Sequence, residues 1–475
     1  MTLKTKYFGD KAFYRRIFLV MLPIMIQNAI TNFVNMLDNL MVGRLGTEEM
    51  SGVSIANTLI FVYNLSVFGA VSGAGIFTAQ YHGKEDAEGV RNCFRFKLMI
   101  AVTLAALACT LLLTKGDVLV SLYLQGEGDP AEAAKILQFA RDYIAVIVIG
   151  LIPSAIAQAF SSTLRETDNG VPPMVAGLIA VGVNLILNYI LIFGHFGAPR
   201  LGVVGAAAAT VASRFVELGI VSVWTFRNKK KAPFIVGAFR SLHVPRQLSR
   251  EIVKKGFPLM LNETIWAAGV AYLDKCYTTR GLDVVPACNI SNTFFHVMAV
   301  AIISAGSAIG IIIGQKLGAG QTEEAKEDAP RMLVFSVLLG VAVGILYAGV
   351  AFIAPQLYNT TDSVKHLATQ FLLVTAVFMP IEGPLNVSYF LVRSGGKTLI
   401  TMFTDCGLLW LVQGTTAFFL SEFTNIPVIP LFALVEAGMI VKLAVSLLFV
   451  ANGKWAHSVV EEDLTEDRLP SSADA

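Results

Sequence analysis

Asparagines and one aspartate recur at helical spacing in residues 27–40, QNAITNFVNMLDNL, inside an apolar run that extends from 17 to 42. Asn28, Asn32, Asn35 and Asp38 (or Asn39) follow one another by three or four residues. At about 3.6 residues per turn, these positions share one face of a helix. A lone carboxylate in such a helix suits a Na⁺ or a proton, whereas asparagines suit either a polar cavity or hydrogen bonds between helices.

Two further carboxylates occupy apolar segments in the second half of the chain. Glu263 stands 235 residues after Asn28, an offset at which the sequence repeats itself. Glu382 lies between Pro380 and Pro384. Prolines interrupt helical hydrogen bonding and free carbonyl oxygens that can help to hold a cation. We therefore expect that a cation, Na⁺ or H⁺, binds to the protein either at Asp38 or at Glu263 and Glu382.

Other polar residues inside apolar segments are weaker candidates. Asn184 and Asn188 are one helical turn apart, and Thr210 precedes Arg214 and Glu217, which are spaced for a local ion pair. Asp274 and Asp405 lie nearer segment ends, where solvation at the membrane interface is expected. The candidates for lining a substrate cavity are Asn28, Asn32, Asn57, Asn262, Trp266, Asn292 and His296.

The composition indicates that the apolar segments lie in a membrane. Of the 475 residues, 55% are hydrophobic and 15% charged, and the mean hydropathy is +0.65. Segments of about 20 apolar residues are long enough to cross a bilayer. We predict an all-α polytopic protein with twelve spans, at 17–42, 52–80, 98–114, 139–163, 172–194, 203–226, 257–277, 287–314, 332–354, 367–392, 399–420 and 427–450.

The Lys and Arg residues set the expected orientation. With the N-terminus inside, the inner segments hold 26 of the 36 Lys/Arg and the outer segments eight, while Arg214 and Lys442 lie within spans. Positively charged loops remain on the cytoplasmic side. We expect a multi-pass protein of the inner (plasma) membrane with both termini cytoplasmic. The net charge of +2 gives no indication of nucleic-acid binding.

The chain is an internal duplication. IANT at 55–58 returns as ISNT at 290–293, and Pro23 returns as Pro258, both at offset 235; Arg214 returns as Lys442 at offset 228. Each half has six spans, so the two lobes should be related by a pseudo-twofold axis along the membrane normal, with a cavity between them. We expect an N-lobe at 1–226, a cytoplasmic linker at 227–256, a C-lobe at 257–451 and a cytoplasmic tail at 452–475. GxxxG patterns at 69–73 and 306–310 predict close helix packing.

Motifs of other chemistries are incomplete. Ser394–Thr398 (SGGKT) resembles the end of a phosphate-binding loop, but Leu391 occupies the position of the required glycine. There is neither HExxH nor GxSxG, and the five cysteines form no CxxC pair. We therefore expect no enzyme, no ATP and no cofactor beyond the coupling ion, and the energy for transport must come from an ion gradient.

Several segments resemble the multidrug and toxic compound extrusion (MATE) family, in its bacterial type. The resemblance extends over nearly the whole chain, because the motifs occur in the family's order and spacing. They are DNLMVGRLG at 38–46, AQYHG at 79–83, LR at 164–165, NLILNYILIFG at 184–194 and LGVVGAA at 201–207. The resemblance implies a twelve-helix, two-lobed fold that exports organic, often cationic, compounds in exchange for Na⁺ or H⁺.

The resemblance also implies roles for particular residues. The family's acid in span 1 falls on Asp38, its polar pair in span 5 on Asn184 and Asn188, and its span-6 threonine on Thr210. The second residue of the pair is often Asp in the family, so Asn188 removes one titratable group from this lobe. In one branch of the family an acid in span 10 falls on Glu382. That branch's span-7 acid falls on Trp266, one turn from Glu263.

The leading hypothesis is a cation-coupled antiporter for organic small molecules that works by alternating access. Asp38 with Asn35, Asn184 and Asn188, or Glu263 with Glu382, would bind the cation. A lipid-linked precursor flippase is the first alternative and would need a basic cavity, for which Arg214 and Lys442 are the intramembrane candidates. A membrane component that transports nothing is the second, and the buried carboxylates argue against it.

Overall fold

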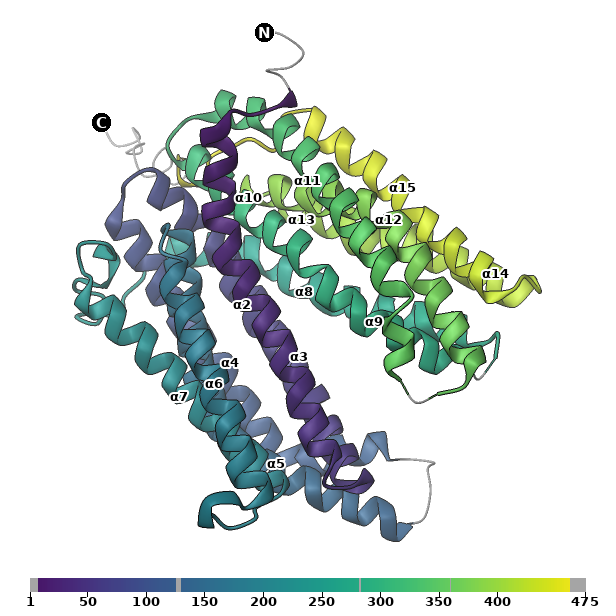
Figure 1. Cartoon of the computed structure of the whole chain (residues 1–475). Coiled ribbons are helices and arrows are strands. Elements are labelled where there is room, and N and C mark those ends of the chain that lie inside the picture. Colours follow the sequence, from purple (N-terminus) through teal and green to yellow (C-terminus); the bar gives the residue numbers. More distant parts are fainter. Residues whose placement is uncertain (1–6, 125–129, 282, 359, 462–475) are drawn as a thin grey trace, which may run out of the picture. The chain divides into compact units, whose positions relative to one another are not determined.

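The computed structural model describes residues 7–124, 130–281, 283–358 and 360–461, without the side chains of 34–36, 39 and 40. Every regular element in these ranges is helical, as expected from the sequence. Figure 1 shows long helices running side by side through the chain. In the first half they are α2 (Lys11–Gly43), α3 (Thr47–Gly83), α4 (Ala87–Tyr123), α5 (Pro130–Glu166), α6 (Val171–Phe193) and α7 (Val203–Arg227), with η1 (His195–Gly197) and η2 (Pro233–Ile235).

The second half repeats this plan with more interruptions. Its elements are α8 (Arg246–Thr278), α9 (Val284–Met298), α10 (Val300–Gly318), α11 (Thr322–Ala351), η3 (Ala354–Leu357), α12 (Asp362–Ser394), α13 (Thr398–Met402), η4 (Phe403–Gly407), η5 (Leu409–Gly414), α14 (Thr415–Phe423) and α15 (Val428–Ala451). Ten of the described helices are long and apolar enough to span a membrane. The two other expected spans correspond to α8 and to the interrupted helix from α13 to α14. The twelve-span architecture is therefore confirmed.

Two spans of the second half are not single regular helices. The span expected at 287–314 is divided at Ala299 into α9 and α10. The span expected at 399–420 contains two π-helical stretches, η4 and η5, which end at Gly407 and Gly414. Such wide turns occur often at functional sites. Asp405 lies within the first of them.

The chain divides by its contacts into two compact units. The first-half unit contains Ile26–Thr78 and Ala87–Gly256. The second-half unit contains, among the described residues, 7–25, Ala79–Asp86 and 257–461. The beginning of α2 and the end of α3 therefore pack with helices of the second half, through Ile17 and Met21 in the core of α10, α11 and α12. The lobe boundaries inferred from the repeat remain a prediction.

Small residues allow these helices to pack closely. In the first-half unit α6 and α7 meet where a Cβ on Gly205 would lie 2.6 Å from the Leu191 carbonyl oxygen. At the GxxxG patterns, Gly73 lies against Gly256, while Gly306 and Gly310 lie against α12. A membrane offers little hydrophobic drive for helix association, so this close van der Waals packing is an important source of stability. The close packing expected for the pattern at 306–310 is confirmed, and in the pattern at 69–73 it is seen at Gly73.

In the second-half unit, the end of α3 packs against the end of α10 through residues that the internal repeat relates. A Cβ on Gly83 would overlap the carbonyl group of Gln315, and a Cβ on Gly318 would overlap the carbonyl group of Gln80. These are the repeat-related pairs at offset 235, and each glycine faces the partner's glutamine. The side chain of Gln80 also accepts a hydrogen bond from Val459 N at 2.8 Å, which fastens the segment after α15 to the end of α3.

We expect Gly318→Ala to destabilise the protein markedly. The added methyl group would meet backbone atoms of Gln80, which cannot move as the end of a flexible side chain can. Gly219→Ala is the matched control, because a Cβ at Gly219 in α7 meets nothing within 4 Å. Alanine is favoured over glycine within helices by about 1 kcal/mol, so the control should be neutral or stabilising. Thermal unfolding in detergent measures both variants, and equal melting temperatures would contradict this packing.

Candidate functional site

A cavity of about 480 Å³ lies within the first-half unit. Its walls come from α2, α3, α5, α6 and α7. Polar residues collect in it although these helices are otherwise apolar. Those used in the description below are Asp38, Asn57, Tyr143, Asn184, Asn188, Thr210 and Arg214.

Helix α6 places two amides together in this cavity. Asn184 and Asn188 are one turn apart, and their exposed fractions are only 4% and 1%. Valine, isoleucine and leucine occupy most of the positions around them. Because buried amides need polar partners, the two asparagines must face other polar groups across the helix interface.

Hydrogen bonds link four residues that the sequence analysis singled out: Asp38, Asn188, Asn184 and Thr210. Asn188 Nδ2 donates to Asp38 Oδ1 at 2.5 Å and to Asn184 Oδ1 at 3.2 Å. Asn184 Nδ2 donates to Thr210 Oγ1 at 3.2 Å. If the Asn184 amide is turned over, its nitrogen donates to Asp38 Oδ1 at 2.9 Å and its oxygen accepts from Thr210. In either orientation the side chains from α2, α6 and α7 form one connected network.

One acceptor in this network is left over. Asn188 Oδ1 is buried and has no hydrogen-bond partner among the residues that the structure describes. A buried polar atom without a partner costs about 1–3 kcal/mol. The oxygen belongs to the amide that donates to Asp38, so an unsatisfied acceptor and a carboxylate occur in the same small network. Oxygen atoms of this kind are the ligands that hard cations prefer.

Two further pairs of polar side chains border the cavity. Tyr143 donates its hydroxyl proton to Asn57 Oδ1 at 3.2 Å, which joins α5 to α3. Arg214 Nη1 forms the expected ion pair with Glu217 Oε2, at 3.1 Å on the same helix. Arg214 also lies within electrostatic range of Asp38. Sequence reasoning missed Tyr143, although a tyrosine within a span can be recognised as a polar group.

Only part of the expected polar face of α2 lines the cavity. Asp38 lines it together with Gln27 and Thr31, whereas Asn28 and Asn32 are not among its lining residues. Adjacent residues on a helix differ by about 100° in direction, so the asparagines point to a neighbouring face. Their assignment to a substrate cavity remains a prediction. The Asn35 side chain lies outside the described part of the structure.

The second-half unit has a polar network of its own. Asn262 Nδ2 on α8 donates to Asp405 Oδ2 at 2.9 Å, and Lys442 Nζ on α15 forms an ion pair with Asp405 Oδ1 at 3.5 Å. Lys442 and Asn262 are buried. Asp405 therefore has partners on two other helices, while its side chain remains 28% exposed, and its expected position at the membrane interface stays a prediction.

Three glutamates lie around this network. Glu382 on α12 is within electrostatic range of Lys442 and Asp405, and Glu263 on α8 is within range of Asp405 and Arg393. Glu436 on α15 interacts electrostatically with Glu382 and Lys442. Sequence reasoning missed Glu436, although an acid in the middle of the segment 427–450 was a visible signal.

The other residues assigned to a substrate cavity are dispersed. Asn292 on α9 donates to Asp274 at 3.3 Å, so that acid too has a protein partner. Trp266 is half-buried on α8, and His296 is exposed on α9. None of the three lines the cavity of the first-half unit.

Comparison with known proteins agrees with this architecture. The MatE family model matches residues 23–190 and 277–411. The chain is 26% identical over 457 residues to the "Probable multidrug resistance protein NorM" of Thermotoga maritima, which covers 94% of each chain. It is 22% identical over 453 residues to the "Probable multidrug resistance protein YoeA" of Bacillus subtilis, covering 94% of this chain and 95% of that one.

Solved structures share the fold. A MOP-superfamily transporter from Pyrococcus furiosus superposes with a TM-score of 0.82 at 19% identity and covers 94% of this chain and 97% of its own. An outward-facing multidrug resistance MATE transporter also gives 0.82 at 18% identity, with 92% and 96% covered. The matched segments contain the spans that place Asp38, Asn184 and Asn188 together. The chain therefore belongs to the MatE family of membrane transporters.

Proposed function

We propose that this transporter is a cation-coupled antiporter that exports organic compounds, often cationic ones, and that Asp38 is its coupling site. The observation that carries the proposal is the buried network in which Asp38 meets Asn188, whose own Oδ1 has no partner among the described residues. The multidrug-resistance names of the relatives support the substrate class.

The coupling ion is Na⁺ or H⁺. Asp38 supplies a carboxylate, while Asn184, Asn188 and Thr210 supply amide and hydroxyl oxygens around it. A proton would bind to Asp38 alone, whereas Na⁺ would use several of these oxygens together. Asn35 remains a candidate ligand from its position on α2. The cation works by favouring one of the two access states of the transporter, while the substrate favours the other.

Glu263 and Glu382 are the lesser candidates for the coupling site. The ammonium group of Lys442 is already held at Asp405 and lies within electrostatic range of Glu382. This built-in cation would repel a second one and partly neutralise the carboxylates. The second-half network also has an amide oxygen without a partner among the described residues, Asn262 Oδ1, but its carboxylate Asp405 already has an ammonium partner. Arg214, the cation within electrostatic range of Asp38, is paired with Glu217 instead, so the first-half network is the better cation site.

The distribution of basic residues disfavours the flippase alternative. A lipid pyrophosphate would need several basic groups in one cavity. Arg214 is the one Lys or Arg among the residues that line the first-half cavity, and Lys442 belongs to the second-half unit. A transporter of the plasma membrane with both termini in the cytoplasm fits the Lys/Arg distribution. The proposed partners are the bilayer and an organic small molecule, with no need for ATP, nucleic acid or another cofactor.

Export from proteoliposomes tests this proposal. A fluorescent organic cation is loaded, and a Na⁺ gradient and a pH gradient are imposed separately. We expect one of the gradients to drive efflux by the wild type, and Glu382→Gln to retain most of that rate. Loss of coupling in Glu382→Gln would move the site to the second half. Failure of both gradients to move any organic cation would contradict the proposed function.

A further inference from the structure

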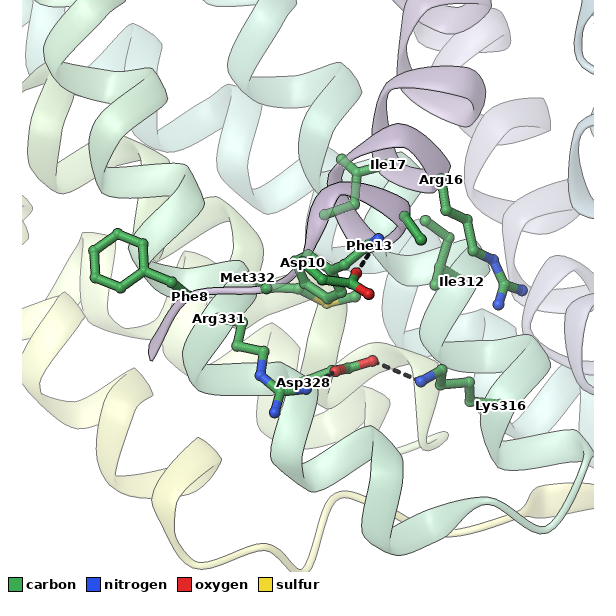
Figure 2. Close-up of a pocket in the computed structure, with 12 residues that line it drawn as sticks. Phe8, Asp10, Phe13, Arg16, Ile17, Ile312, Lys316, Asp328, Arg331 and Met332 are labelled. Carbon is green, nitrogen blue, oxygen red and sulfur yellow. Dashed lines mark hydrogen bonds and ion pairs between the residues drawn. The ribbon is translucent and has the colours of Figure 1, made fainter. Parts of the chain in front are cut away.

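A second cavity, of about 490 Å³, lies where the chain enters α2. It belongs to the second-half unit and lies between the first turns of α2, the end of α10 and the beginning of α11 (Figure 2). Asp38 and its network are on the far part of α2, in the first-half unit. The proposed transport mechanism therefore leaves this cavity without a role.

Basic side chains from three helices line the cavity. Asp328 on α11 is flanked by Lys316 Nζ at 2.6 Å and Arg331 Nη1 at 2.8 Å. Figure 2 shows its carboxylate between the two cations. Their side chains are only 16% and 18% exposed, and Asp328 is 6% exposed. Two cations on one buried carboxylate leave a positive charge within the wall.

The other charges of the wall leave this balance positive. Arg16 on α2 is exposed and donates to Gln315 Oε1 at 3.0 Å. Asp10 accepts from the backbone of Phe13 at 2.7 Å and so caps the start of α2. Glu324 lies 3.4 Å from Lys316, but it is 60% exposed and outside the lining, so it screens the cavity weakly.

The other surfaces of the cavity are apolar. Phe8, Phe13, Ile17, Ile312 and Met332 surround the charged groups. Phe8, just before α2, is 49% exposed, and Phe18 and Leu19 on α2 are exposed apolar residues as well. Aromatic and basic residues at the start of a span are typical of the boundary between lipid and water.

The first turns of α2 are basic. Lys11, Arg15 and Arg16 lie in them, and the residue just before the helix, Asp10, is acidic. Basic segments beside a membrane span attract anionic lipids, each charge contributing about 1 kcal/mol near the surface. Arginine suits this task, since its planar guanidinium group can donate two hydrogen bonds to one phosphate. A cavity with a charged floor and apolar walls fits a ligand with both properties.

We propose that this cavity binds an anionic phosphate group and that its natural ligand is the headgroup of an anionic phospholipid. Arg16, Lys316 and Arg331 hold the phosphate, while Phe8 and Phe13 contact the glycerol and the beginning of the acyl chains. The lipid thereby links the first turns of α2 to α10 and α11 within the second-half unit.

Thermal stability of the full chain in mild detergent tests the site. Short-chain phosphatidylglycerol, short-chain phosphatidylcholine and inorganic phosphate are titrated separately at equal ionic strength. We expect phosphatidylglycerol to raise the melting temperature, because a ligand that binds only the folded state stabilises it, and we expect phosphatidylcholine to have little effect. An effect of inorganic phosphate equal to that of phosphatidylglycerol would identify the source of the anion as soluble. Equal effects of the two lipids, or no effect of any anion, would overturn the proposal.

Variants at two neighbouring arginines distinguish lipid binding in the cavity from general attraction of the lipid by positive charge. Arg16→Gln should raise the half-maximal phosphatidylglycerol concentration by about three- to tenfold, the range expected for a lost charge-assisted hydrogen bond. Arg15→Gln removes the same charge from the same turn at a residue that does not line the cavity, and it should change nothing. Equal weakening by both variants would overturn the site.

A fluorescence measurement does not depend on the arginine variants. Phe8→Trp places a reporter at the exposed rim of the cavity. Brominated phosphatidylglycerol should quench the introduced tryptophan more strongly than brominated phosphatidylcholine, at the same mole fraction in vesicles. Equal quenching by the two lipids would show ordinary bilayer contact and would contradict a headgroup site.

Discussion

Asp38→Asn should abolish gradient-driven accumulation of substrate while leaving the protein folded. The asparagine has the same shape and can still accept from Asn188, but it carries no charge to attract Na⁺ and cannot take up a proton. A tenfold cation gradient supplies about 1.4 kcal/mol. One-for-one exchange can therefore support a ratio of about tenfold between the substrate concentrations on the two sides of the membrane. We expect this ratio to fall to about one in the variant.

Proteoliposomes that carry an imposed gradient measure the ratio directly. Asp117→Asn is the matched control, because Asp117 is an exposed carboxylate of the same unit, paired with Arg141 at the surface. It should transport as the wild type does. A wild-type substrate ratio in Asp38→Asn would show that this carboxylate is not the coupling site.

Lys97→Met should produce the largest loss of stability. The Lys97 side chain is completely buried on α4, where Nζ donates to Ser162 Oγ at 2.9 Å, to Thr163 Oγ1 at 3.4 Å and to the carboxylate of Glu166. Removal of the ammonium takes this ion pair away from the buried carboxylate of Glu166, which keeps the hydrogen bond from Ser162 Oγ at 2.7 Å. Breaking one side of a buried ion pair costs about 3–5 kcal/mol. Thermal unfolding in detergent should show a decrease of several degrees.

The double variant Lys97→Met/Glu166→Met provides the control. Replacement of both charges by apolar side chains also removes the carboxylate that has lost this ion pair, so most of the stability should return. The difference between the double variant and the sum of the single ones measures the interaction of the pair. A double variant no more stable than Lys97→Met would contradict this explanation.

The sequence contained enough information to predict the spans and the first-half network. Spans follow from length and hydropathy, which the bilayer imposes directly. Asn184 and Asn188 could be paired from their spacing on one helix. Their meeting with Asp38 and Thr210 followed from the family resemblance, and the structure places all four in one network.

The second-half network could not be predicted in the same way. Asp405 was expected at the interface because it lies near the end of an apolar segment, and hydropathy does not report which side chains it contacts. Nor does hydropathy reveal the two π-helical stretches, the first of which contains Asp405. The contact of Lys442 with Asp405 joins two helices far apart in the chain, and only tertiary packing brings them together. The asparagines of α2 are a similar case, because periodicity gives a face but not the neighbour that it meets: Gln27 and Thr31 line the first-half cavity, whereas Asn28 and Asn32 do not.

Reciprocal flux is the most direct test of cation coupling. Proteoliposomes with equal Na⁺ and pH on both sides are given a gradient of organic substrate alone, and intravesicular pH and Na⁺ are recorded. Because coupling between two ligands is mutual, substrate moving in one direction should drive Na⁺ or H⁺ in the other, and Asp38→Asn should show no such flux. Wild-type substrate movement without any opposite cation flux would contradict the antiport account.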